Sequence, residues 1–522
     1  MRWFWAHIVL YLLMTQVVRS QQTTMADAFL GTDSATCARI RSGDYTVHPA
    51  ISPVGLRTVT DTVGVSALTK GRFVRGHLLN VSKGAFSFSV DPSIDALFRY
   101  GTESGVAPII GAGLRLRADI TDKMLAEVEY QFLTQWPMQM DAMGSTVGGV
   151  VPGRGPVDIN NPGGSASLHE VRGRVAYKPS EFFTVDAGYD KLQFGTGHRS
   201  LFLSPNADQF LFLRLNTSFW RIKYVNVFAN FRDIRPGAYP NKFGTFHYLS
   251  MNVGKRFNFG FFESIIWQGA DSTGSRGFEP NYLNPIIFYR PVEFSLNSPD
   301  NAFVGLDVRL RFAGNNHIYG QLLLDEFILG EVFAKLKSDT TVPVEYWGNK
   351  QGWQIGLMGH EPFKLKGLFY RTEFNWVRPF TYTHVTVEQN FGHANQALAH
   401  PLGANFMESF TNIGWRKGRW AIDLRYTWAT YGTDSSGASH GQDIYKSYLL
   451  RVREYGNYMT QGLKTQLNHV ALTAGYLINP EMNLRAIAGV AYRDERSSQF
   501  QRSDFYFTIG ISSSLFRYYS DY

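Results

Sequence analysis

Apolar and polar residues alternate with a period of two along most of the chain after residue 95. Between Ile109 and Ile120, one set of alternate positions holds only Ile, Ala and Leu, and the other holds Arg115, Arg117 and Asp119 with glycines. Successive side chains of a β-strand point to opposite faces. The alternation therefore predicts a strand with one apolar face and one charged face.

The next segment repeats the pattern and predicts a hairpin. After a short polar stretch, apolar residues alternate with Glu127 and Glu129. Folding the chain about Asp122 places Arg117 opposite Glu127 and Arg115 opposite Glu129, and it brings the two apolar faces together. Charge pairing and apolar pattern thus predict the same register.

Other segments show the same alternation, and they are 171–177, 183–190, 304–312, 368–376 and 422–428. A soluble β-sandwich or propeller also has alternating strands. However, these strands run for about 9–12 residues, which exceeds the usual ~5–6 and matches a tilted membrane strand. The length favours a membrane barrel over a soluble sheet.

The connections between the predicted strands alternate between short and long. The short ones are near 121–123, 178–181, 217–219, 255–257, 313–316, 416–419 and 478–482. The long ones are 135–168, 191–208, 230–245, 268–301, 328–350, 378–407, 429–466 and 493–503. Short periplasmic turns and long outer loops are typical of outer-membrane barrels.

We therefore expect an all-β fold, a transmembrane outer-membrane β-barrel of about 18 antiparallel strands over residues 95–522. The expected strand starts are 95, 109, 123, 169, 182, 209, 219, 246, 258, 303, 317, 352, 367, 408, 419, 467, 483 and 505. The last strand, 505–516, should close the barrel with an apolar face that includes Phe505, Ile511 and Leu515.

The region before the barrel divides into two parts. Residues 1–20 have a basic start, an apolar stretch and a small residue at Ser20, which predicts a secretory signal peptide. A retained anchor helix is the alternative, but the apolar stretch is short for a membrane span. Residues 21–94 are polar, and we interpret them as a periplasmic segment and candidate plug. Residues 85–90 form a candidate extra strand.

Composition then excludes several classes of protein. The chain has 522 residues, and after residue 20 no apolar run approaches the ~20 residues of a spanning helix, which excludes a multi-helix transporter. Its single Cys excludes a disulfide scaffold and a Cys-based zinc or iron–sulfur site. The net charge of +8 falls to about +6 when Arg2 and Arg19 leave with the signal peptide.

The charged positions of the strands predict a charge network in the lumen. Its expected members are Arg115, Arg117, Glu127, Glu129, Arg172, Arg174, Asp186, Arg309 and Arg311. In one interpretation the arginines neutralise carboxylates across the strands and fill the interior. In the other, the lumen is mildly cationic and attracts an acidic glycan or another anion.

No catalytic, metal or cofactor site is expected. The chain contains no nucleophile elbow, and His384, His393 and His400 fall in one loop with spacings that match no standard metal site. Aromatic and Asn/His-rich loops suit sugar binding, because ring faces stack on pyranoses and amides hydrogen-bond hydroxyls. Aromatic residues also form membrane girdles, so this signal is not specific.

Three loop stretches resemble the capsule-assembly Wzi family of outer-membrane proteins. They are 188–207, with Gly-Thr-Gly-His-Arg at 195–199; 278–302, with Glu-Pro-Asn-Tyr-Leu-Asn-Pro at 279–285; and 378–405, with Arg-Pro-Phe-Thr-Tyr-Thr-His at 378–384. The branch that they most resemble includes the gliding-motility protein RemB. The resemblance implies an 18-stranded barrel, closed toward the periplasm, whose outer surface acts as a lectin for capsular polysaccharide.

The stretches also provide the candidate ligand-binding residues. These are His198, Arg199, Asn281, Tyr282, Arg290, Tyr382, His384, Asn395, His400 and Asn405. The alternative is that the same loops fold inward and close the pore. The prolines and glycines in them indicate a defined backbone in either case.

The expected function is a non-enzymatic outer-membrane lectin that retains surface or capsular polysaccharide. The alternatives are a component of surface adhesion or gliding machinery and a channel for anionic solutes. Expected partners are polysaccharide, outer-membrane lipid and lipopolysaccharide, and surface-machinery proteins, with no nucleic acid. The expected location is the outer membrane of a Gram-negative cell.

Overall fold

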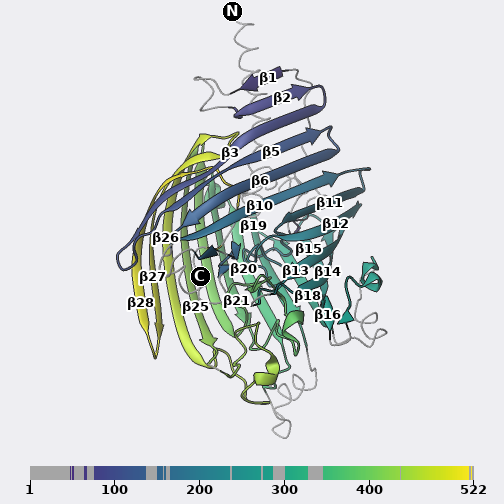
Figure 1. The fold of residues 1–522 in the computed structure, drawn as a ribbon, viewed down its shortest axis with the longest axis vertical. Coiled ribbons are helices and arrows are strands. Elements are labelled where there is room, and N and C mark those ends of the chain that lie inside the picture. Colours follow the sequence, from purple (N-terminus) through teal and green to yellow (C-terminus); the bar gives the residue numbers. More distant parts are fainter. Residues whose placement is uncertain are drawn as a thin grey trace, which may run out of the picture.

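A computed structural model of the chain describes residues 48, 50–51, 64–67, 76–136, 150–156, 158–159, 165–235, 238–271, 274–285, 300–326, 345–435, 437–516 and 519. Its tilted strands form a closed antiparallel barrel (Figure 1). Each strand pairs with the next along the chain, and the last, β28, pairs with the first, β3. The predicted barrel of 18 strands is confirmed.

The barrel strands are β3 (Phe86–Gly101), β5 (Ile109–Ile120), β6 (Met124–Gln135), β10 (Ala166–Tyr177), β11 (Phe183–Asp190), β12 (Phe210–Phe219), β13 (Ile222–Arg232), β14 (Asn241–Val253), β15 (Phe257–Gln268), β18 (Asn301–Arg311), β19 (Asn316–Leu324), β20 (Gln351–His360), β21 (Leu368–Val377), β24 (Phe406–Lys417), β25 (Trp420–Thr433), β26 (Leu463–Asn479), β27 (Leu484–Ser497) and β28 (Gln501–Ser512). Shorter elements are β1 (Gly64–Ala67), β2 (Leu79–Lys83), β4 (Gly105–Val106), β7 (Val150–Val151), β8 (Gly155–Pro156), β9 (Asp158–Ile159), β16 (Ala270–Asp271), β17 (Gly274–Ser275), β22 (Gly392–His393), β23 (Gln396–Ala397) and the 3₁₀ turns η2 (Pro280–Leu283), η3 (Pro362–Lys364), η4 (Val387–Gln389) and η5 (Tyr448–Leu450). No helix in this described part of the chain has the length and hydropathy needed to cross a membrane.

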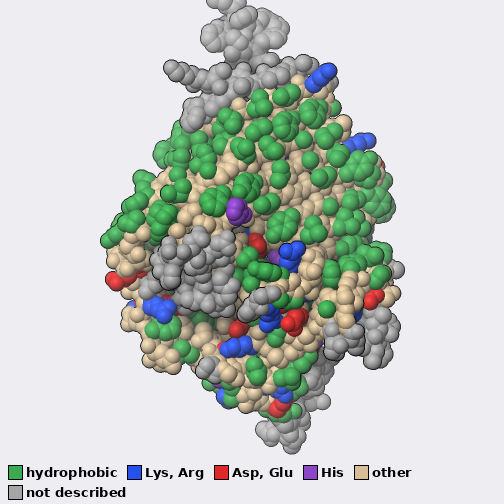
Figure 2. All heavy atoms as spheres, in the orientation of Figure 1, with side chains coloured by type: hydrophobic (Ala, Val, Ile, Leu, Met, Phe, Trp, Pro, Cys, Tyr) green, Lys and Arg blue, Asp and Glu red, His purple; other side chains and the backbone are tan. Residues whose placement is uncertain are grey.

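The period-two pattern is realised as an apolar exterior and a polar interior. In β5 and β6, Arg115 lies opposite Glu129 and Arg117 opposite Glu127, which is the predicted register. The alternate positions face outward, where Ile110 remains 56% exposed. Figure 2 shows apolar side chains spread over the barrel wall on the face in view. Such a surface matches the hydrocarbon of a bilayer.

The first strand differs from the expectation. β3 begins at Phe86 rather than at 95, and it runs without a break through most of residues 85–90, which the sequence predicts as a separate strand. It can pass through Pro92 because β2 pairs with its residues 86–90 and β28 with its residues 95–101, which leaves 91–94 without a strand on that edge. The N–H that proline lacks is therefore not needed there.

The last hairpin also differs. The expected long connection at 493–503 is a short turn, since β27 extends to Ser497 and β28 begins at Gln501. β28 ends at Ser512 instead of continuing to 516. Leu515 is buried inside the barrel, where its N–H donates to Glu129 Oε1 at 3.1 Å, and it does not lie on the lipid-facing side. The chain thus turns into the lumen after its last strand.

Candidate functional site

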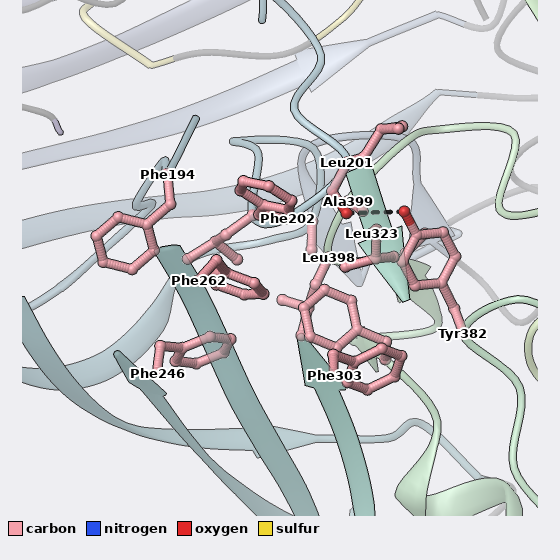
Figure 3. Packing of buried hydrophobic residues seen from close by; sticks show 14 of the residues in the cluster. Phe194, Leu201, Phe202, Phe246, Phe262, Phe303, Leu323, Tyr382, Leu398 and Ala399 are labelled. Carbon is pink, nitrogen blue, oxygen red and sulfur yellow. Dashed lines mark hydrogen bonds between the residues drawn. The ribbon is translucent and has the colours of Figure 1, made fainter. Parts of the chain in front are cut away.

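The connection between β11 and β12 folds into the lumen. Inside the barrel, the Phe194 ring stacks on Tyr248 of β14 at 5.3 Å between centroids. Figure 3 shows Phe202 stacked on Phe262 of β15, at 4.7 Å between centroids. All four side chains are buried. The inner wall of these strands is apolar, so water in the lumen would be unfavourable there, and covering the rings with the loop is stabilising.

The tip of this loop is held by carboxylates of the wall. The Thr196 N–H and hydroxyl donate to Asp307 of β18 at 3.0 and 2.8 Å, and the His198 N–H donates to Glu373 of β21 at 2.6 Å. Gly197 lies so close to β20 that a Cβ there would be 2.0 Å from Gln354 Oε1. The Gly-Thr-Gly sequence is explained by this close approach of loop to wall.

Arg199 makes the deepest contact. Its guanidinium donates to Glu408 of β24, and both side chains are almost completely buried. His400 Nε2 lies 2.8 Å from the second oxygen of the same carboxylate, and Asn375 Nδ2 donates to that oxygen at 2.6 Å. The Arg199 guanidinium also lies 5.0 Å from the centroid of Phe410. Two predicted ligand residues, Arg199 and His400, are thus joined through one wall carboxylate.

The connection between β21 and β24 forms the second part of the filling. The Tyr382 hydroxyl donates to Leu201 O at 2.8 Å, which joins the two inward loops (Figure 3). Asn405 Nδ2 donates to Gly432 O at 3.0 Å. Asn395 hydrogen-bonds the backbone of Ile234 in both directions. These predicted residues are used within the fold.

Two further histidines lie in the same loop. His393 accepts from Arg232 N at 3.0 Å, and its other ring nitrogen lies 2.9 Å from Gln209 O. Burial lowers the pKa of His393 to about 4. Burial, and then the nearby Lys350, lower the pKa of His384 to about 4. Both rings are neutral at pH 7, and the described residues contain no group of His, Cys, Asp or Glu that could hold a metal ion.

Both ends of the chain contribute to the filling. Gly195 N donates to Ala50 O at 2.9 Å, and His48 Nδ1 lies 2.8 Å from Ser250 Oγ. From the other end, the Tyr519 hydroxyl donates to His198 O at 2.7 Å. We call the inward parts of 191–209 and 378–405, together with residues 48–51 and 513–519 where described, the plug.

The second stretch of resemblance lies on the outside of the wall. Tyr282 is buried against Trp267 at 4.8 Å between centroids, and its hydroxyl donates to Asp300 at 2.7 Å. Asn281 is exposed and donates to Glu279 at 2.7 Å. Arg290 lies outside the described residues. The segment 274–285 therefore acts as a strap against the wall and does not join the plug.

The strap reaches a buried polar row on the outer face of the wall. Asn226, His247 and Glu263 lie opposite one another on β13, β14 and β15. Their neighbours Val227 and Phe246 pack inward with the plug, so these three side chains face outward. Asn226 Nδ2 donates to Pro285 O at 3.4 Å, and all three are buried. Covering them is required, because polar groups facing hydrocarbon are costly.

The predicted charge network forms the wall on the opposite side. Arg172 donates to Glu129 and Glu127 at 2.8 Å each, and Arg117 donates to Glu127 at 3.1 Å. Other members take partners that the hairpin argument did not give: Arg115 lies 3.4 Å from Asp91, and Asp186 accepts two bonds from Arg214. Arg174, Arg309 and Arg311 lie on β10 and β18, with Arg174 and Arg309 buried.

Sequence reasoning missed the residue that anchors the plug. Glu408 was not a candidate, although its position in β24 follows the alternation and places it on the inner face. An acidic residue at an inward position without an arginine opposite was the available signal. Glu408 lies opposite Asn375 and Ala429, so its cation had to come from outside the wall.

The closed cylinder, apolar outside and charged inside, defines the class: the chain is a transmembrane β-barrel of the outer-membrane type. A scan with protein-family models found no match, and neither did a search of curated proteins.

Solved structures with a similar fold include Wzi, described as an outer-membrane protein involved in group 1 capsule assembly in Escherichia coli and as a carbohydrate-binding β-barrel. It is 11% identical, with a TM-score of 0.49, over 81% of this chain and 84% of Wzi. They also include Pseudomonas aeruginosa OprD, at 10% identity and a TM-score of 0.40 over 81% and 94%. Acinetobacter baumannii OccAB2 has 10% identity and a TM-score of 0.42 over 81% and 96%. At these values the matches concern the barrel fold and select no function.

Proposed function

We propose that this barrel is a non-enzymatic lectin of the capsule-assembly type, which binds and retains surface polysaccharide at its outer end. The observation that carries the proposal is the plug. A channel needs a continuous aqueous path, whereas here apolar ring stacks join the inward loops to β14 and β15, hydrogen bonds to buried carboxylates join them to β18 and β21, and a buried ion pair joins them to β24. A barrel with this interior is suited to presenting a surface.

The resemblance of the three loop stretches to the Wzi family supports the same function. Most of the predicted ligand residues, however, are buried in the plug or, for Tyr282, in the strap. A side chain without exposed area does not touch a polysaccharide that arrives from outside. We infer that these residues shape the outer end and that other residues contact the glycan. Membership of the RemB-like branch and export by a signal peptide at 1–20 belong to the same proposal.

The test uses the full-length barrel purified in detergent. We expect it to bind at least one polysaccharide on an array of microbial capsular and exopolysaccharides, and to show no steady large-pore current in a planar bilayer. A steady current without glycan binding would contradict the proposal and favour the anion channel. If the protein shows no glycan binding and no current, the proposal is contradicted as well, and a role as a partner in surface machinery is favoured.

A further inference from the structure

The outer end of the barrel carries an aromatic cluster whose inner rings rest on the plug, with Trp347 against Phe380 and Tyr448 against His384, and whose outer rings are exposed. It lies in the β19–β20 and β25–β26 connections, at the lower end in Figure 1. Ring centroids follow one another from Tyr455 to Tyr346 at 5.3 Å, to Trp347 at 5.5 Å and to Tyr448 at 4.5 Å. We call these rings, with Tyr458, Arg451 and Arg453, the outer ledge.

The ledge is exposed although much of it is apolar. Tyr455 is 47% exposed and Tyr458 is 52% exposed, and Leu449, Leu450 and Val452 beside them are at least half exposed. These residues belong to a long connection at the outer end, away from the lipid-facing strands. Exposed apolar groups gathered in water at one place mark an interaction surface.

Hydrogen bonds and a cation–π contact hold the base of the ledge in place. Trp347 Nε1 donates to Glu454 Oε2 at 2.9 Å, and the Trp347 N–H donates to Glu454 O at 3.0 Å. The Arg451 guanidinium lies over the Trp347 ring at 4.6 Å. Asn457 is buried and donates to Glu345 O, Arg453 O and Glu454 O. Rings held in place lose little conformational entropy when a ligand binds.

The charge of the ledge points to the class of ligand. Arg453 is exposed, and its guanidinium lies 5.8 Å from the Tyr458 centroid. Arg451 is partly neutralised by Glu454. An exposed arginine can pair with a sugar carboxylate, and the exposed tyrosine rings near it offer faces on which pyranose rings stack.

We propose that the outer ledge is the binding site for an acidic polysaccharide, with pyranose rings on Tyr455 and Tyr458 and a sugar carboxylate on Arg453. This inference rests on the proposed function and names its site. The site is absent from the predicted ligand residues because those came from the three stretches that resemble the Wzi family, and the 429–466 connection is not one of them.

The experiment compares four full-length proteins on the polysaccharide array, with alginate and polygalacturonate added as acidic probes and dextran as a neutral probe. They are the wild type, Tyr455→Ala/Tyr458→Ala, Arg453→Gln, and the control Tyr239→Ala. Tyr239 is 65% exposed in the β13–β14 connection, also at the outer end. Circular dichroism and thermal melting establish that each variant is folded.

We expect the affinity of the double variant for the preferred glycan to be at least about tenfold lower than that of the wild type, which is the scale of a central aromatic contact. Arg453→Gln should weaken binding of acidic glycans and reduce its dependence on salt, while Tyr239→Ala should match the wild type. If the wild type binds no glycan, the proposed function fails. If it binds and the double variant retains its affinity, or Tyr239→Ala loses as much, only the ledge is wrong. A neutral preferred glycan unaffected by Arg453→Gln overturns the acidic assignment.

Discussion

The ion pair between Arg199 and Glu408 should decide whether the barrel is closed. Replacing Arg199 with Met keeps much of the side-chain volume but removes the guanidinium, and it leaves the Glu408 carboxylate in a position with 0% exposure. Breaking a buried pair by removing one partner costs about 3–5 kcal/mol. The hydrogen bonds between the strands do not involve this pair, so the free-energy cost destabilises the inward conformation of the 191–209 connection and not the barrel wall.

The expected result is a shift of the loop toward an unseated state. At 1.4 kcal/mol per factor of ten, the ratio of open to closed forms should rise by about two to four orders of magnitude. Single-channel recording in planar bilayers should detect openings absent from the wild type, and thermolysin should cleave more readily within 194–203. The barrel itself should melt at nearly the same temperature.

Two further variants, one expected to restore closure and one control, test this prediction. Arg199→Met/Glu408→Gln removes both charges, and Asn375 can still donate to the amide oxygen, so most of the closed state should return. Arg117→Met removes a guanidinium that pairs with Asp119 and Glu127 within the wall, and it should not open the barrel. The reasoning is refuted if Arg199→Met stays closed and protected, or if Arg117→Met opens the barrel equally.

Three further predictions concern the plug. Because the folded pKa values of His384 and His393 are depressed to about 4, their contribution to stability is present above the unfolded value near 6.5 and is lost as pH falls through 4. Channel openings should therefore increase as the pH falls over that range. If a variant with both histidines replaced by Asn keeps the same pH response, the histidines are not its cause. Gly197→Ala places a Cβ 2.0 Å from Gln354 Oε1, which is a steric clash, so the inward loop should be displaced and protease sensitivity should rise. Unchanged sensitivity would show that the Gln354 side chain moves aside instead. Tyr519→Ala removes a hydrogen bond and a ring contact to His198, so the free energy of opening of the plug, measured by hydrogen exchange, should fall by about 1–2 kcal/mol. Equal exchange rates in the two proteins would count against a role for the C-terminal tail.

The strand pattern was predictable because a barrel wall between lipid and a polar lumen imposes period two on every residue. β5 and β6 show this most clearly: a one-residue slip would turn Arg115 and Arg117 to the lipid, so the register follows from the sequence. The ends of the barrel were less predictable. The sequence of 505–516 alone does not show where the chain leaves the sheet: the Ser513 N–H still donates to Ile94 O of β3, whereas the Leu515 N–H donates to Glu129 in the lumen.

The candidate site was less predictable for a different reason. A loop that projects outward and a loop that folds inward have similar composition, since both need glycines, prolines and hydrogen-bonding side chains. His400 and Asn405 are predicted ligand residues because they lie in a loop stretch that resembles the Wzi family and carry hydrogen-bonding groups, yet their partners are Glu408 and the backbone at 432 and 461. Only the three-dimensional pairing distinguishes a ligand contact from an internal one.

One feature of the sequence nevertheless records where the plug sits. β15 does not alternate: Phe261, Phe262, Ile265, Ile266 and Trp267 place apolar groups on both of its faces. A large ring left in a wet lumen forgoes about 4–6 kcal/mol of burial, from 150–250 Å² at 25 cal/mol per Å². A strand with two apolar faces therefore requires a second cover, and β15 has the plug inside and the strap outside. Loss of period two in a barrel sequence thus marks a covered wall, whereas β5 and β6, with charged inner faces, line the polar network.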